Sequence, residues 1–168
     1  MSAYARIVKC REKAAMTSEA ELQVYECNCL ALRQAARRLT QFYDRFLAPT
    51  GLRTTQFSIL AKLHGLGPMT INALARELVT DRTTLGRTML PLKREGLIII
   101  EDSAVDRRSK ELRLTRKGGE RLRAAFKPWR EAQTQFSRIF GEERAARLRR
   151  ELHALASSEL ATGKRFED

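Results

Sequence analysis

The sequence predicts a mainly α-helical fold with one small β-hairpin at its centre. Apolar residues recur every three or four positions in long segments near both ends of the chain, which is the pattern of amphipathic helices. Two shorter helical segments follow one another between residues 70 and 95, and a strand-like hairpin follows them directly. We therefore expect a winged helix-turn-helix, in which the hairpin is the wing, flanked by long dimerisation helices.

The composition is that of one globular domain. The chain has 168 residues, of which 43% are hydrophobic and 31% charged, a balance that disordered and membrane proteins do not show. The longest apolar run, Leu97–Ile100, is far too short to cross a bilayer, and Met1–Ala15 lacks the apolar stretch of a signal peptide. A cytoplasmic protein with no membrane partner is predicted.

The first half of the chain contains two helices before the central motif. The first is expected from Glu19 to Leu47, because Pro49 and Gly51 end its periodic pattern. The second begins at Thr54 or Thr55 and stops at the glycines and the proline of residues 65–68.

The central motif is bounded by capping residues. Thr70 is a suitable N-cap for a short helix, and Asp81 is suitable for a longer one that ends before Gly96. The residues between them, Val79 and Thr80, form a tight turn. Two capped helices separated by such a turn predict a helix-turn-helix.

The hairpin and two further helices complete the chain. Strands are expected at Leu97–Glu101 and Glu111–Leu114, with a polar turn between them. Thr115 begins a helix to about Phe140, and Gly141 separates it from a last helix through about Leu160. Met16 is a second candidate for the start of translation. The predicted regions are a leader at 1–17, an N-terminal dimerisation helix at 18–50, the winged helix-turn-helix at 51–118, C-terminal dimerisation helices at 119–162 and a frayed tail at 163–168.

The net charge favours a polyanionic partner. It is +12, and arginine suits both phosphates and guanine edges. The N-terminal residues of a helix in the major groove meet base edges; here they are Arg82, Thr83, Thr84 and Arg87. The tip of the hairpin, Asp106-Arg107-Arg108, places arginines where a minor groove or phosphates would lie. Double-stranded DNA is the predicted partner.

Residues 54–118 resemble the MarR family of winged-helix transcription regulators. The resemblance is carried by TTQFSILAKL, TINALARELVTDRTTLGRTMLPLKREGLI and DSAVDRRSKELRLTRKG. It implies a homodimer, usually a repressor, whose two copies read half-sites about 34 Å apart. It also implies that Thr83, Thr84 and Arg87 face bases, that Arg107 or Arg108 is the wing arginine, and that Asp106 orients an arginine. Thr54, Thr70 and Lys93 are weaker candidates for phosphate contacts.

Pro91 departs from a regular recognition helix. A proline inside a helix removes a backbone donor and crowds the preceding turn. We expect a kink near Arg87–Leu90 that leaves the base-reading turn in place.

The sequence leaves the regulatory signal open. Cys27 and Cys29 lie two residues apart at the start of the first helix, and their thiols are interpreted as buried hydrophobes, as redox sensors or as ligands for a soft metal ion. An organic ligand is the other alternative, for which Tyr43, Phe46, Phe57 and Trp129 are weak candidates to line a cleft.

Two other function classes compete with a specific regulator. A non-specific architectural nucleic-acid-binding protein would share the basic charge, and a thiol peroxidase would use Cys27 and Cys29 as attacking and resolving thiols. The sequence contains no phosphate-binding glycine loop, no His-Glu metal pair and no nucleophile–histidine spacing. We therefore predict a regulator rather than an enzyme, with no cofactor and no resident metal.

Overall fold

The computed structural model of the chain describes residues 26–102 and 110–158. The chain divides into two compact units, residues 1–41 and 42–168. The boundary falls inside helix α3 (Asn28–Leu47). The described part of the first unit is an exposed helix, in which the Ala31 N–H donates to the Cys27 carbonyl over 3.0 Å. Glu26 and Cys27 are not helical, so the expectation of one continuous helix from Glu19 is wrong.

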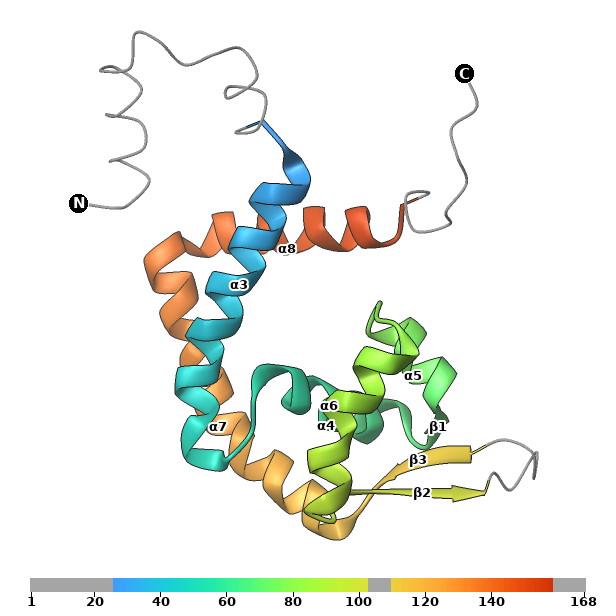
Figure 1. The fold of residues 1–168 in the computed structure, drawn as a ribbon. Helices are drawn as coiled ribbons and strands as arrows, with labels where there is room; N and C mark the ends of the chain where they lie inside the picture. Colours follow the sequence, from blue (N-terminus) through green and yellow to red (C-terminus); the bar gives the residue numbers. More distant parts are fainter. Residues whose placement is uncertain (1–25, 103–109, 159–168) are drawn as a thin grey trace, which may run out of the picture. The chain divides into compact units, whose positions relative to one another are not determined.

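The second unit contains the winged helix-turn-helix and two further helices (Figure 1). Its elements, after the end of α3, are a 3₁₀ turn η1 (Ala48–Thr50), α4 (Thr54–Leu66), β1 (Met69–Thr70), α5 (Ile71–Glu77), α6 (Arg82–Arg94), β2 (Ile98–Asp102), β3 (Lys110–Leu114), α7 (Arg116–Phe140) and α8 (Glu142–Ala156). This order confirms the predicted fold class. Helix α8 ends about four residues earlier than expected, where Ser157 caps it through its backbone N–H.

The sheet has one strand more than the predicted hairpin. Its order is β1-β3-β2, and both pairings are antiparallel. Leu112 of β3 lies opposite Ile100 of β2 and Met69 of β1. The two-residue strand β1 escaped prediction because its partner lies about forty residues later in the chain, and no local pattern marks so short a strand.

A single apolar core supports the motif. Leu60, Leu74, Leu92, Leu97 and Leu112 have exposed fractions of 0%. Four of these residues belong to α4, α5, α6 and β3, and Leu97 immediately precedes β2. The helices and the sheet therefore share one core. The core fixes the position of α6 relative to the sheet.

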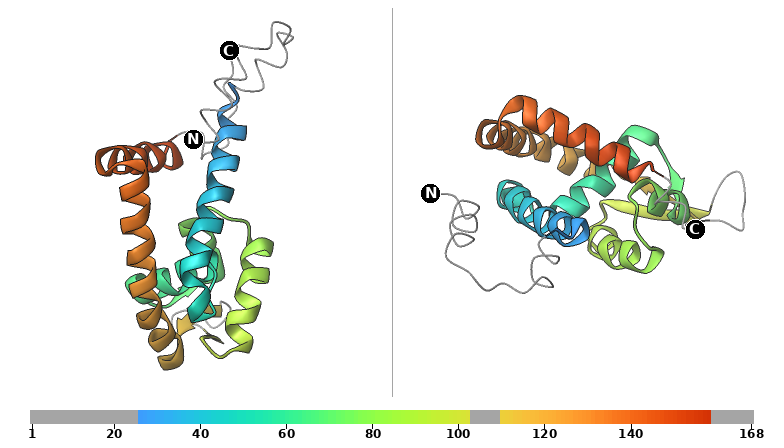
Figure 2. Two further views of the ribbon diagram at one scale, coloured as in Figure 1. Left: turned by 90° about the vertical axis from the view of Figure 1, so that its left-hand side faces the viewer. Right: turned by 90° about the horizontal axis from the view of Figure 1, so that it is seen from above.

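The two C-terminal helices meet at Gly141. This residue has φ 94°, a left-handed conformation that favours glycine, and its N–H donates to the Ser137 carbonyl over 2.8 Å. Helix α8 consequently turns away from α7 at a large angle (Figure 2).

Candidate nucleic-acid interface

Helix α6 is capped as its sequence predicts. The Thr84 N–H donates to the Asp81 Oδ1 over 2.8 Å, which satisfies one of the free donors of the first turn. The hydrogen bond from the Thr84 side chain, followed by that from its backbone, lowers the pKa of Asp81 below 3.8. Asp81 is therefore charged at neutral pH, where it also complements the positive end of the helix. The cap of α5 is confirmed in the same way, since the Ala73 N–H donates to the Thr70 hydroxyl over 3.2 Å.

One face of α6 is buried and the opposite face is open to solvent. Leu85 and Met89 have exposed fractions of 2% and 4% and pack into the core. The predicted base-reading side chains Arg82, Thr83, Thr84 and Arg87 are all exposed. The structure thus brings these four residues together on the first two turns of a helix whose other face packs into the core.

Pro91 does not interrupt this helix. Helix α6 continues to Arg94, and the Pro91 carbonyl accepts a hydrogen bond of 2.9 Å from the Glu95 N–H. The ring lies in the last turn, where only a few residues follow it. The base-reading turn is therefore regular helix, as expected, and the predicted kink stays a prediction.

The C-terminal end of α6 is held by the first turn of α7. Lys117 Nζ donates to the Glu95 carbonyl over 2.8 Å, and the Thr115 hydroxyl donates to the Gly96 carbonyl over 2.7 Å. Gly118 packs so closely against the Leu97 carbonyl that a Cβ atom would collide with it. The two hydrogen bonds hold the turn that follows α6, while carbonyls of the last turn of α6 accept from the backbone N–H groups of Glu95, Gly96 and Leu97. Sequence reasoning did not assign this function to Lys117, although its position just after the N-cap Thr115 is visible in the sequence.

The weaker phosphate candidates have different surroundings. The Thr54 hydroxyl and N–H both bind Asp44 Oδ1 over 2.7 Å, so Thr54 connects α4 to the end of α3. Thr70 is half-buried and caps α5. Lys93 is exposed in the last turn of α6. The predicted phosphate contacts of all three residues stay predictions.

The base of the wing carries paired charges. Lys110 lies 3.0 Å from Asp102, and Arg113 bridges Glu101 at 3.2 Å and Glu111 at 3.4 Å. All five side chains come from β2 and β3. The predicted wing residues Asp106, Arg107 and Arg108 lie outside the described residues.

The aromatic candidates for a ligand cleft do not form one site. Phe57 stacks on Trp129 with ring centroids 5.7 Å apart, and both pack with the core. Tyr43 is half-buried, and this burial raises the pKa of its hydroxyl although the charge of Arg149 opposes the shift. Phe46 is the one of these four aromatic residues that lines the groove between α3 and α7.

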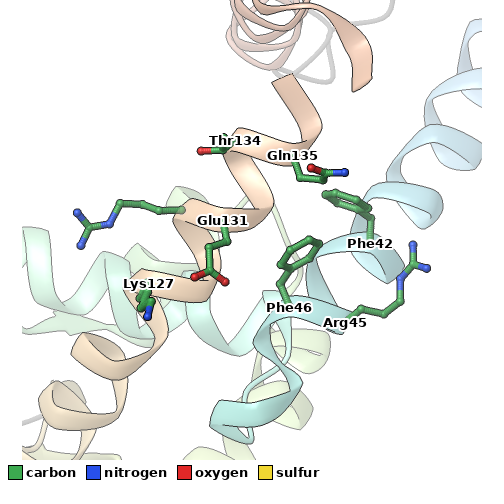
Figure 3. A pocket seen from close by; sticks show the side chains of 8 residues that line it. Phe42, Arg45, Phe46, Lys127, Glu131, Thr134 and Gln135 are labelled. Atoms are coloured by element: carbon green, nitrogen blue, oxygen red, sulfur yellow. The ribbon is translucent and has the colours of Figure 1, made fainter. Parts of the chain in front are cut away.

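That groove lies between the end of α3 and the middle of α7 and has a volume of about 910 Å³. Figure 3 shows Phe42 and Phe46 directed from α3 toward Glu131 and Gln135 on α7. Its other lining residues are Arg45, Lys127, Arg130 and Thr134. The groove therefore combines an aromatic wall with both signs of charge, and sequence reasoning placed only one of its residues.

Both described cysteines are exposed in a single copy of the chain, so neither belongs to the core of one copy, and their burial in the dimer stays a prediction. Cys27 precedes the first residue of α3, and its Sγ accepts from the Leu30 N–H over 3.5 Å. Cys27 thus occupies the N-cap position, where polar side chains usually lie. No group of three His, Cys, Asp or Glu residues that could hold a metal ion occurs among the described residues. Cys10 lies outside them.

An exposed polar helix on a winged helix-turn-helix defines a class of protein that reads duplex DNA. The MarR family model matches residues 52–110. The chain is 37% identical to the transcriptional regulator MosR of M. tuberculosis, solved in complex with DNA, with 82% of this chain and 99% of that chain covered and a TM-score of 0.73. The chain belongs to the MarR family of transcriptional regulators.

Two further solved structures are similar. The transcriptional repressor CouR, bound to a 23-mer DNA duplex, is 26% identical over 84% of this chain and 99% of that one, with a TM-score of 0.72. A probable transcriptional regulator from Pseudomonas aeruginosa is 26% identical over 79% and 98%, with a TM-score of 0.71. No curated protein sequence matches the chain. In the described part of the chain, no helix is long and apolar enough to span a membrane.

Proposed function

We propose that this chain is a sequence-specific repressor that binds a palindromic operator as a homodimer in the cytoplasm, and that it has no catalytic activity. The observation that carries the proposal is the exposed first half of α6, where Arg82, Thr83, Thr84 and Arg87 lie on a helix fixed by the core. An arginine side chain can donate two hydrogen bonds to the edge of a guanine, and threonine hydroxyls can hydrogen-bond to base edges in the major groove. The relatives MosR and CouR were both solved with DNA.

A binding assay with the Arg87→Ala variant tests the proposal. The probe is a labelled duplex from upstream of the protein's own gene, at fixed salt and with excess competitor DNA. We expect Arg87→Ala to lose about 1–3 kcal/mol of specificity, and Arg108→Ala in the wing to weaken all sequences more evenly. Arg123→Ala, which removes one exposed charge from α7, is the matched control. If Arg87→Ala left the sequence preference unchanged, α6 would not be the reading helix.

The same assay separates the competing functions. A specific regulator typically prefers its site over other DNA by about 10³-fold or more, whereas an architectural protein would bind both alike. A thiol peroxidase would turn over peroxide in the presence of a thiol reductant, and a regulator would not.

The exposure of both thiols favours oxidation as the regulatory signal. Oxidation of one thiol to a sulfenic acid, or an intersubunit disulfide, would change the N-cap of α3, because Cys27 Sγ could no longer accept from Leu30 in the same way. Treatment with diamide, which forms disulfides, or with hydrogen peroxide, which also forms sulfenic acids, is expected to release the wild type from its operator and to leave a Cys27→Ser, Cys29→Ser variant bound. Release of the variant as well would exclude these thiols, and binding indifferent to both oxidants would favour an organic ligand in the groove of Figure 3.

A further inference from the structure

Val79 has a backbone conformation that its side chain disfavours. Its φ is 48°, and it is the one non-glycine residue with positive φ in the part of the chain that the structure describes. A β-branched residue in this left-handed region is a conformational outlier. The strain lies in the turn between α5 and α6, three residues before Arg82.

The surrounding hydrogen bonds explain why the turn needs this conformation. The Val79 N–H donates to the Arg76 carbonyl over 3.1 Å, and the Thr80 N–H donates to the Ala75 carbonyl over 3.0 Å. These are the two bonds of a Schellman motif, which ends a helix with one left-handed residue that is usually glycine. The fold therefore sets the φ of residue 79 and favours glycine there.

No contact among the described residues compensates for the valine. Its side chain has an exposed fraction of 76%, so it gains little from burial. Strained residues that are retained cluster at binding and catalytic sites. Val79 adjoins the exposed, basic and hydroxyl-bearing start of α6, which is the surface assigned above to DNA.

We propose that Val79 is a specificity-determining residue whose isopropyl group contacts the C5-methyl group of a thymine in the operator. This inference rests on the proposed function, because it places Val79 in the same interface as Arg87. Thymine methyls are the apolar groups that the major groove presents. Binding to DNA would bury the two exposed methyl groups of Val79. This burial would stabilise the complex and offset the strain of the left-handed backbone.

Two variants test this contact. Val79→Gly relieves the strain, so its melting temperature is expected to rise by a few degrees while its affinity for the footprinted upstream duplex falls about tenfold. Val79→Asn also accepts a left-handed φ but adds less flexibility than glycine, and it is expected to lose affinity to a similar extent. Leu66→Ala, which trims an exposed leucine at the end of α4, should change neither quantity appreciably.

Thymines of the duplex are then replaced one at a time by deoxyuridine, which lacks only the methyl group. Replacing one particular thymine should weaken binding of the wild type, and the same replacement should leave the affinity of Val79→Gly unchanged. The proposal is overturned if Val79→Gly binds as tightly as the wild type, if it is no more stable, or if every replacement affects both proteins alike. Failure of the wild type to bind any upstream duplex specifically would instead contradict the proposed function.

Discussion

The winged helix-turn-helix and the long helices bury their apolar side chains to different extents within one chain. Helix α4 buries Phe57, Ile59, Leu60 and Leu63, with exposed fractions of 6% or less. In α8 the only buried residue is Ala145, while Leu152 and Leu155 are 37% and 40% exposed. Ile139, near the end of α7, is 69% exposed. The winged region is therefore complete in one copy, whereas the long helices retain apolar surface that a second copy would cover.

The exposed apolar residues of the winged region are scattered. Leu66 at the end of α4 and Ile99 in β2 have exposed fractions of 56% and 39%, and two others lie beside or on α6. Val79 and Leu90 lie in the turn before α6 and on α6 itself, with exposed fractions of 76% and 49%. They adjoin polar and basic side chains rather than an apolar face. Exposed apolar residues on the long helices therefore indicate a protein partner, whereas Val79 and Leu90 adjoin the surface that we propose binds DNA.

The largest expected effect comes from placing charges on the long helices. Ile139→Asp together with Leu155→Asp should give a monomer by light scattering, because a carboxylate in an apolar interface is strongly unfavourable. The affinity for a two-half-site operator should fall by about 10²–10⁴-fold, since the second half-site no longer contributes. Leu66→Asp, on the winged region, is the control and should remain dimeric. A monomeric variant with wild-type affinity would contradict the assignment of these helices to dimerisation.

Shortening a buried side chain in the core of the winged region should lower the stability of the fold, and this loss should not depend on dimerisation. Leu60 is fully buried, and Leu60→Ala is expected to lower the free energy of unfolding by about 2–5 kcal/mol through lost burial and a cavity. Denaturant titration measures the change. Leu66→Ala, at an exposed position of the same helix, should stay within about 0.5 kcal/mol. Equal losses in the two variants would show that the core does not lie where the structure places it.

Alanine substitutions at the adjacent residues Gly118 and Gly119 test how the start of α7 packs against the segment that follows α6. A Cβ atom at Gly118 would collide with the Leu97 carbonyl, so Gly118→Ala should destabilise by about 1–3 kcal/mol. At Gly119 the nearest atoms lie 3.8 Å away or more, and alanine there should stabilise α7 by about 0.5–1 kcal/mol because of its helix propensity. Thermal unfolding of the two variants side by side should give shifts of opposite sign.

The smallest effect concerns the cap of α6. The pKa of Asp81 is lowered in the folded chain by its bonds to Thr84. Its contribution to stability is therefore present above pH 3.8 and is lost as the pH falls through the lowered pKa. Asp81→Asn keeps a capping oxygen but does not titrate. The stability of the wild type relative to this variant should decrease in acid, and a constant difference would exclude the carboxylate as the cause.

The elements that local chemistry specifies were predictable from the sequence. Thr70, Asp81 and Thr115 were each expected to begin a helix, and in each case the side-chain oxygen accepts from a backbone N–H three residues later. Such a bond depends on a few consecutive residues and on nothing else in the fold. The helix periodicity placed Arg82, Thr83, Thr84 and Arg87 near the start of α6 for the same reason.

The sequence by itself thus determined the order of the helices and the hairpin, the caps at Thr70, Asp81 and Thr115, and the polar character of the start of α6. Only the tertiary structure decided that Phe57 and Trp129 stack in the core, that Thr54 binds Asp44, that β1 joins the sheet and that Phe46 lines a groove with residues of α7. These features join residues that are far apart in the chain, so their energy depends on the whole packed arrangement rather than on any local pattern. The left-handed φ of Val79 is local by contrast, because it is set by the hydrogen bonds that end α5; the sequence did not reveal it because this position usually holds glycine.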